Sequence, residues 1–392
     1  MKEQLQLHRE KIDQARAYMR EREIDLLVIR DRGTGDPSVA LLFGTTTTAD
    51  TVYVIAGDRN IAVVHTDDEA VIAATELFDE TRAYTGEGPG ETVHALIRSL
   101  DPGRIALNFS RDNPLADGLT VGSYRSLLKM FGEPYSGRVV SSEDYIQKLR
   151  SIKSAQEVAY IRRAIEITLD IYREVFAAIR PGMTEIEVGQ LFIEGMRARG
   201  VVNGISRDMS PPIVMKHKIA HRPPGEGVIE PGDYLIIDFS VDYMGYCSDI
   251  ARTAYVLKEG ETAASEAMAA AFRTVREATD EAVAALKPGA VGKDVDHAAR
   301  QYVLDRGYPN IFHSVGHQVG RDVHDGGTLL GPERKGYRQD SLGIVEEGMV
   351  FAIEPTILYE EGPAIISEDN YLVTADGAEL LGEPQTELVL IR

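Results

Sequence analysis

The sequence predicts a two-domain protein in which an α/β domain is followed by an α+β domain. The chain has 392 residues, enough at roughly 100 to 200 residues per domain for two separate hydrophobic cores. Short β-branched runs alternate with helical patterns up to about residue 145, whereas long, capped helices and strand pairs follow from residue 151. We therefore place the first domain at residues 1–145 and the second at residues 151–392.

The first domain is expected to alternate helices with strands. A polar, amphipathic helix is predicted over residues 4–22 and another helix over residues 91–100. Four β-branched runs predict strands, at residues 25–30, 51–56, 60–66 and 104–109. The glycine-rich segment 86–90 matches neither the dinucleotide-binding nor the Walker spacing, so we interpret it as a connecting loop.

Two capping boxes mark the first helices of the second domain. Residues 154–157 (SAQE) open a long helix with an apolar face, and Pro181 with Gly182 ends it. Residues 184–187 (TEIE) open a second helix that ends near residue 200. Two further helices are predicted, over residues 262–286 and 293–306.

Charge and cysteine content exclude several classes of partner. There are 62 acidic residues against 42 Lys and Arg, a formal net charge of −20, so we expect neither nucleic acid nor a membrane surface as a partner. Cys247 is the only cysteine, which excludes an intramolecular disulfide and a thiolate cluster that holds a structural zinc or an iron–sulfur centre. The sequence shows no apolar signal region and no run near the roughly 18 residues of a membrane span. A cytoplasmic location is expected.

Two aspartates interrupt apolar runs on either side of a predicted turn. Residues 242–245 have Asp first and Gly fourth, as in a four-residue β-turn. Opposed residue numbers would then sum to 487, so that Asp238 faces Asp249. Two such charges about 4 to 5 Å apart repel by roughly 3 to 4 kcal/mol at an effective dielectric near 20, so we expect a cation between them. Solvent-facing aspartates, or a salt bridge to Arg252, are the alternatives.

A second hairpin repeats this arrangement with glutamates. Residues 349–359 and 364–373 flank a three-residue loop that ends in glycine, and opposed numbers sum to 722, so that Glu354 faces Glu368. A bulge at Pro355 would shift this pairing by one residue. Paired carboxylates on two hairpins indicate a site for two divalent ions about 3.5 to 4 Å apart.

Histidines supply the candidate nitrogen ligand. Six of the nine histidines fall between residues 217 and 324, and the segment 313–325 carries three of them. Position 314 is Ser, so the segment is not an H-E-x-x-H zinc motif. One imidazole from this segment would complete the coordination of one ion, and the other ion would have oxygen ligands alone. Four histidines, His297 from this range and three from earlier in the chain, are interpreted as structural: His8, His65, His94 and His297.

Five of these residues follow one another in a characteristic order. They are Asp238, Asp249, His317, Glu354 and Glu368, with an eleven-residue step between the aspartates, GHxxG around the histidine and GMVFAIEP around the first glutamate. In these features residues 151–392 resemble the pita-bread metallopeptidases, in particular the Xaa-Pro branch that comprises aminopeptidase P and prolidase. Residues 1–145 resemble the creatinase-type N-terminal α/β domain of that branch, which implies a homodimer.

The resemblance implies a ligand role for each of the five residues. Asp238 would chelate one ion, Asp249 and Glu368 would bridge both, and His317 with Glu354 would complete the other. Four carboxylates and one imidazole suit Mn²⁺ or Co²⁺, with Zn²⁺ or Fe²⁺ as alternatives.

Three further histidines match substrate-binding positions of that branch. His221 and His313 would shape a proline pocket, His324 would stabilise the oxyanion, and Glu354 would carry a proton to the leaving nitrogen. We thus expect catalytic roles for Glu354, His324 and His221. The chain departs from its relatives at Ile366, where they usually carry arginine two residues before the second glutamate. The departure bears on substrate choice more than on the metal site.

The function implied is that of an exopeptidase that hydrolyses the Xaa-Pro bond at the N-terminus of peptides or in dipeptides. Its partner would be a proline-containing di- or oligopeptide. One alternative is a creatinase-like or ectoine-hydrolase-like C–N hydrolase that acts on a small amide. The other is a non-catalytic peptide-binding module, although such modules tend to have lost their ligands.

Overall fold

The computed structural model describes residues 2–33, 35–86, 88–218, 222–333, 339–360 and 362–392. The chain divides into two compact units, one up to Arg150 and one from Ser151, and each is described by itself. Every helix among the described residues is too short or too polar to cross a lipid bilayer.

A six-stranded mixed sheet forms the first unit. Its strands, in spatial order, are β4 (Glu80–Tyr84), β3 (Arg59–His65), β2 (Thr51–Ala56), β1 (Leu26–Asp31), β5 (Ile105–Leu107) and β6 (Val139–Ser141). Its helices are α1 (Lys2–Glu21), α2 (Pro37–Leu42), α3 (Glu69–Ala74), α4 (Gly90–Leu100), α5 (Val121–Phe131) and α6 (Glu143–Ser151). The four predicted strands and both predicted helices occur within a few residues of the expected bounds.

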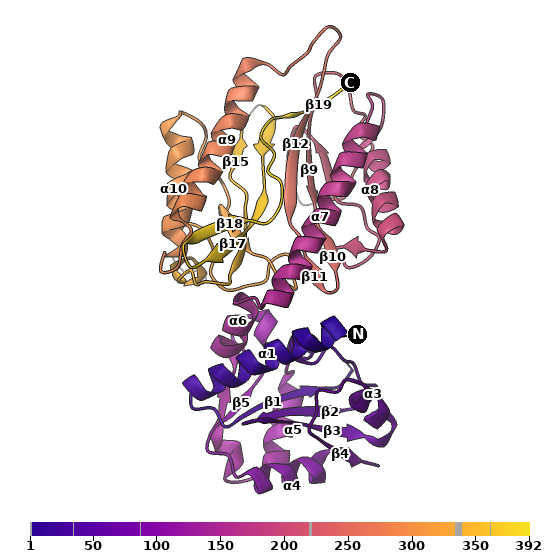
Figure 1. Cartoon of the computed structure of the whole chain (residues 1–392), viewed down its shortest axis with the longest axis vertical. Coiled ribbons are helices and arrows are strands. Elements are labelled where there is room, and N and C mark those ends of the chain that lie inside the picture. Colours follow the sequence, from indigo (N-terminus) through magenta and orange to yellow (C-terminus); the bar gives the residue numbers. More distant parts are fainter. Residues whose placement is uncertain (1, 34, 87, 219–221, 334–338, 361) are drawn as a thin grey trace. The chain divides into compact units, whose positions relative to one another are not determined.

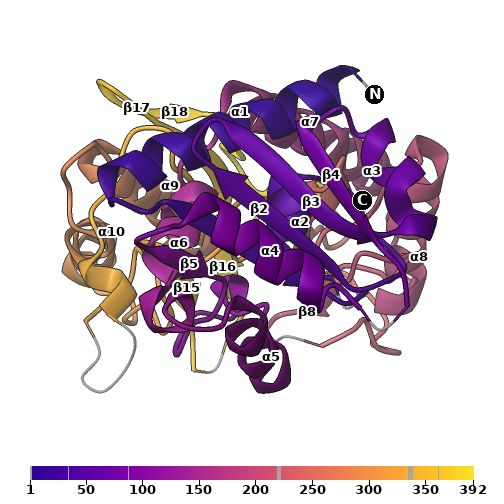
Figure 2. The ribbon, with the colours of Figure 1, turned by 90° about the horizontal axis from the view of Figure 1, so that it is seen from below.

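Helices cover both faces of this sheet (Figures 1 and 2). Because side chains alternate along a strand, Leu27 of β1 packs in one apolar cluster with α1, and Val28 packs in another with α4 and α5. The unit is therefore a three-layer α/β/α structure, and its continuous apolar strands reflect burial on both faces.

The second unit is built on two four-stranded sheets with helices packed against them (Figure 1). The β12 sheet has the order β19 (Val389–Ile391), β12 (Ile250–Val256), β9 (Tyr234–Phe239) and β8 (Ile213–Lys216). The β14 sheet has the order β13 (Gly316–Gln318), β14 (Val350–Ile353), β17 (Asp369–Thr374) and β18 (Gly377–Leu380). Smaller sheets consist of β15 (Thr356–Leu358) with β16 (Ala364–Ile366), and of β11 (Tyr246–Cys247), β10 (Val241–Tyr243) and β7 (Val202–Asn203).

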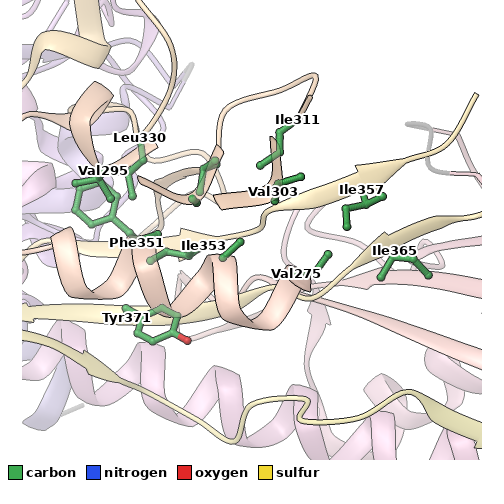
Figure 3. Close-up of a cluster of buried hydrophobic side chains, with 14 of the residues drawn as sticks. Val275, Val295, Val303, Ile311, Leu330, Phe351, Ile353, Ile357, Ile365 and Tyr371 are labelled. Atoms are coloured by element: carbon green, nitrogen blue, oxygen red, sulfur yellow. The ribbon is translucent and has the colours of Figure 1, made fainter. Parts of the chain in front are cut away.

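Four long helices support these sheets. They are α7 (Ala155–Ala178), α8 (Glu185–Arg199), α9 (Glu266–Ala285) and α10 (Gly292–Asp305), close to the predicted bounds. Both predicted capping boxes are formed, since the side chain and backbone of Ser154 bond reciprocally with Glu157 and those of Thr184 with Glu187. Figure 3 shows the apolar core that α9 and α10 form with the β14 sheet, with Val275, Val295, Val303, Phe351, Ile353 and Tyr371 among its members.

The first hairpin has a different register from the predicted one. Asp238 pairs with Ala251, so that opposed numbers sum to 489, and the prediction of 487 is wrong. The turn is a two-residue loop, Met244 and Gly245, between β10 and β11. Both loop residues have positive φ, 57° and 82°, as in a type I′ turn, whose twist matches that of the flanking strands. A shift of two residues leaves Asp238 and Asp249 on one face, because side chains alternate with a period of two.

The second hairpin has the predicted register. Opposed numbers sum to 722 both in the β14–β17 ladder, where Ile353 pairs with Asp369, and in the β15–β16 ladder, where Thr356 pairs with Ile366. Glu354 and Glu368 lie in the interruption between these two ladders. Pro355, which has no backbone N–H, lies in the same interruption.

Candidate metal centre

The predicted ligands come from strands of both sheets and lie at or near strand ends. In the β12 sheet, Asp238 is the next-to-last residue of β9, and Asp249 directly precedes β12. In the β14 sheet, Glu354 follows β14, Glu368 precedes β17, and His317 lies in β13 opposite Ala352. A residue that leaves a ladder can turn its side chain away from the regular alternation, which lets carboxylates from separate strands converge.

The Nε2 atom of His317 lies among three carboxylates. It is 3.3 Å from Oδ2 of Asp249, 3.6 Å from Oε1 of Glu354 and 4.0 Å from Oε1 of Glu368. One ligand atom each from Asp249, His317 and Glu368 lies within 4.8 Å of the others, and all three residues are buried. These distances leave room for a cation that contacts several of the four groups at once.

Asp238 belongs to the same electrostatic group. Its charge raises the pKa of Asp249, Glu354 and Glu368, an effect that requires proximity to each of them. The hydroxyl of Tyr172 on α7 lies 2.9 Å from the carbonyl oxygen of Ile237 and 2.8 Å from that of Ile250. These carbonyls belong to the residues next to Asp238 and Asp249, so α7 fixes the two strands that carry the aspartates.

Protonation in the centre is governed by burial and by like charges. Burial raises the pKa of Asp249, Glu354 and Glu368 well above their usual values, and repulsion from neighbouring carboxylates adds to the effect. Burial, followed by the charge of His324, lowers the pKa of His317 to about 3, so its imidazole is neutral near pH 7. Divalent metal ions bind neutral imidazoles and ionised carboxylates. The carboxylates of this centre need a nearby positive charge in order to ionise. The residues present therefore fit a divalent metal ion.

Two of the three predicted substrate-binding histidines lie at this centre. The Nδ1 atom of His313 is 3.8 Å from Oε1 of Glu354, and its Nε2 atom is 3.0 Å from the hydroxyl of Thr356. The ring of His324 lies 4.2 Å from that of His317, centroid to centroid, at an angle of 45°. The third, His221, lies outside the described residues.

Arg252 binds Glu368 from another strand, whereas relatives carry an arginine at the position of Ile366. Ile366 is buried in an apolar cluster with Ile236 and Ala251. Arg252 donates from Nη1 to the carbonyl of Glu368 at 2.6 Å and from Nη2 to Oδ1 of Asp369 at 2.7 Å. Its positive charge lowers the pKa of Glu368 in opposition to burial. The alternative in which Arg252 forms a salt bridge with the predicted aspartates is therefore not observed, since its carboxylate partner is Asp369.

Sequence reasoning missed Asn370, a buried residue of β17 that hydrogen-bonds to Asp249. The signal available in the sequence was weak, because the residue is a polar, uncharged side chain between Asp369 and an apolar run. A buried amide is expected to have hydrogen-bond partners. The identity of those partners depends on a contact 121 residues away along the chain, which hairpin spacing cannot predict.

Comparison with known proteins assigns the family. Residues 159–375 match metallopeptidase family M24. The chain is 31% identical over 342 residues to the uncharacterized peptidase YqhT of Bacillus subtilis (strain 168), a match that covers 86% of this chain and 91% of the relative.

Solved structures agree over the whole chain. The Xaa-Pro dipeptidase from Bacillus anthracis is similar with a TM-score of 0.78 and 26% identity, over 98% of this chain and 100% of that one. The X-Pro aminopeptidase from Thermotoga maritima MSB8 has the same fold, with a TM-score of 0.76 and 24% identity over 95% and 99% of the two chains. These similarities confirm the predicted fold, a pita-bread α+β domain preceded by a smaller α/β domain. The chain belongs to metallopeptidase family M24 and is a hydrolase of that family.

Proposed function

We propose that the protein is a dinuclear-metal exopeptidase that hydrolyses the bond between an N-terminal residue and a following proline. The observation that carries the proposal is the convergence of buried Asp249 and Glu368, together with Glu354, on a neutral His317. Similarity to an Xaa-Pro dipeptidase and an X-Pro aminopeptidase supports the proline specificity.

Each ligand would have a separate task in holding two ions. Asp238 would bind one ion, His317 with Glu354 would bind the other, and Asp249 with Glu368 would bridge them. Bound divalent ions supply Lewis acidity, which polarises a carbonyl and lowers the pKa of water in the site toward about 7. Mainly oxygen donors with one imidazole favour Mn²⁺ or Co²⁺ over Zn²⁺ or Fe²⁺.

The remaining chemistry is assigned to side chains around the ligands. Glu354 would receive a proton from the attacking water and transfer it to the leaving proline nitrogen, since its carboxylate lies between His313 and His317. His324 would donate a hydrogen bond to the oxyanion that forms on the scissile carbonyl. His313 would contact the substrate from a fixed orientation, because its Nδ1 atom is 2.6 Å from the carbonyl of Ser314 and its Nε2 atom is held by Thr356. We assign His221 to the same proline pocket.

The N-terminal unit would act as a creatinase-type domain that limits substrate length in a homodimer. A proline-containing dipeptide or oligopeptide is the proposed substrate. Cys247, a buried free thiol, fits a reducing compartment such as the cytoplasm.

Metal reconstitution with three substrates tests the proposal. Metal-depleted protein would be reloaded with Mn²⁺, Co²⁺ or Zn²⁺ and offered an Xaa-Pro dipeptide, an Xaa-Pro-Yaa tripeptide and creatine. Cleavage of the dipeptide alone identifies a prolidase, and release of the first residue from the tripeptide identifies an aminopeptidase. Failure to cleave either proline substrate with any of these metals rejects the proposed specificity, and turnover of creatine instead would favour a small-amide hydrolase.

A further inference from the structure

Asn370 binds the backbone of a proposed bridging ligand with both ends of its side-chain amide. Its Oδ1 atom accepts the N–H of Asp249 at 3.0 Å, and its Nδ2 atom donates to the carbonyl of Asp249 at 2.7 Å. Asn370 is 2% exposed, so water does not compete for these bonds. Two hydrogen bonds from one planar amide to one residue restrict both the position and the orientation of Asp249.

The same side chain links the two sheets that supply the ligands. Asn370 lies in β17 of the β14 sheet, two residues after Glu368, and Asp249 directly precedes β12 of the β12 sheet. No ladder joins β12 to β17, and at Asp249 the connection is made by the side chain of Asn370. Asn370 therefore connects the backbone of Asp249 to the strand that carries Glu368, across the boundary between the sheets.

Two neighbouring bonds also hold this boundary, and both bind residues other than Asp249. The N–H of Glu368 donates to the carbonyl of Ala251 at 3.1 Å. The hydroxyl of Thr253 donates to the carbonyl of Ile366 at 2.7 Å. These bonds would keep the two segments together without Asn370, whereas the amide of Asn370 binds Asp249 itself.

We propose that Asn370 is a positioning residue that sets the separation of Asp249 and Glu368, and thereby allows both carboxylates to bridge two ions at once. The inference rests on the proposed dinuclear site. Bridging ligands must span ions about 3.5 to 4 Å apart, so a shift of one carboxylate relative to the other removes the bridge while leaving donors for a single ion. Asn370 thus acts on the second ion more than on the first.

Gln385, which lies between β18 and β19, offers a matched control because it binds a residue of β12 in the same way. Its Oε1 atom accepts the N–H of Thr253 at 3.2 Å, and its Nε2 atom donates to the carbonyl of Thr253 at 2.6 Å. Gln385 is also buried, at 7% exposure. Gln385 therefore makes the same pair of amide bonds as Asn370, but it binds Thr253 in β12, which is not a proposed ligand.

The test compares Mn²⁺ binding to wild type, Asn370→Ala, Asn370→Ser and Gln385→Ala. Calorimetric titration of metal-depleted full-length protein gives the affinity of each ion, and electron paramagnetic resonance distinguishes a spin-coupled manganese pair from isolated ions. Circular dichroism establishes that each variant is folded. The serine variant is included because one short hydroxyl cannot bind both peptide groups of Asp249, yet it remains polar and leaves a slightly smaller cavity than alanine does.

We expect wild type and Gln385→Ala to bind two ions and to show the coupled signal. Asn370→Ala and Asn370→Ser should bind the second ion about 10- to 100-fold more weakly, with a diminished coupled signal and near-normal first-ion affinity. Saturating Mn²⁺ should restore part of kcat with little change in KM, because the defect lies in occupancy of the pair.

Three results would overturn the inference, and they are distinguishable from one another. Unchanged affinity for both ions in Asn370→Ala and Asn370→Ser would remove the positioning role while leaving the proposed function intact. An equal loss of affinity for the second ion in Gln385→Ala would show that any loosening of β12 weakens binding of that ion, without a specific role for Asn370. Failure of the wild type to bind two ions would reject the dinuclear site and with it the role of Asn370.

Discussion

Lys153 and Asp325 form an ion pair of 2.9 Å between side chains that are 0% and 2% exposed. The other carboxylate oxygen of Asp325 accepts the N–H of Asp322 at 3.3 Å, and Asp325 directly follows His324 in the chain. The pair therefore fixes the segment that carries a proposed catalytic histidine.

Removal of one partner of this pair should destabilise the protein strongly. Lys153→Met leaves the Asp325 charge buried, and we expect a loss of about 3 to 5 kcal/mol in the free energy of unfolding, measured by urea denaturation. The double variant Lys153→Met/Asp325→Leu should recover much of that loss because no unpaired charge remains. Equal destabilisation by the single and the double variant would show that packing, and not charge, is what the pair contributes.

Asp249→Asn should change the stability of metal-free and metal-loaded protein in opposite directions. The substitution removes one of several mutually repelling buried carboxylates, so the metal-free variant should have a higher Tm than metal-free wild type. It also removes a proposed bridging ligand, so saturating Mn²⁺ should raise its Tm far less than that of the wild type. Thermal denaturation of the four samples measures both effects, and turnover should fall below detection. Wild-type activity in this variant would contradict the ligand assignment.

His324→Ala should impair turnover without impairing metal binding. The ring of His324 contacts that of His317, and its proposed role is to donate to the oxyanion. Loss of one such donor typically lowers kcat by about 100- to 1000-fold. We expect that decrease on a tripeptide substrate together with unchanged Mn²⁺ stoichiometry. A parallel loss of bound Mn²⁺ would instead assign His324 to the metal site.

Asp36 should make the first unit less stable at neutral pH than at acid pH. Burial raises its pKa from 3.8 to about 6, although Asn108 donates to both carboxylate oxygens at 2.7 Å. The folded form therefore holds its proton more tightly than the unfolded chain, and the stabilising contribution is lost as pH rises from about 4 to about 6. The loss amounts to about 3 kcal/mol for a shift of two pKa units.

Asp36→Asn tests this pH dependence. Asparagine preserves the acceptor that caps α2 through the N–H of Ser38, but it does not titrate. Urea denaturation between pH 4 and pH 7.5 should show a smaller decrease in stability for the variant than for the wild type. Identical pH profiles for the two proteins would mean that other groups cause the dependence.

The sequence predicted the helices, most strands and part of the metal centre, because these features depend on local patterns. The capping boxes at Ser154 and Thr184 and the register between β14 and β17 follow from residues close together in the chain. The register of the first hairpin failed because two overlapping turns fit the same stretch, and the twist of the strands favours the loop at Met244 and Gly245.

Long-range contacts account for what the sequence did not predict. Arg252 reaches Glu368 across 116 residues and Asn370 reaches Asp249 across 121, and neither spacing carries a recognisable pattern. The burial of Ile366 beside Ile236 depends likewise on the packing of the two strands. Charged residues are candidate ligands by their chemistry alone, whereas the role of a neutral amide that binds a ligand's backbone depends on the tertiary contact it makes.

The division of the five proposed ligands between two sheets has a mechanical consequence. Asp238 and Asp249 belong to one sheet, and His317, Glu354 and Glu368 belong to the other, so each ion would cross-link β-structures that share no ladder. Loading with Mn²⁺ should then slow amide hydrogen exchange in β12 and β17 together, and metal removal should let the two halves of the fold open independently.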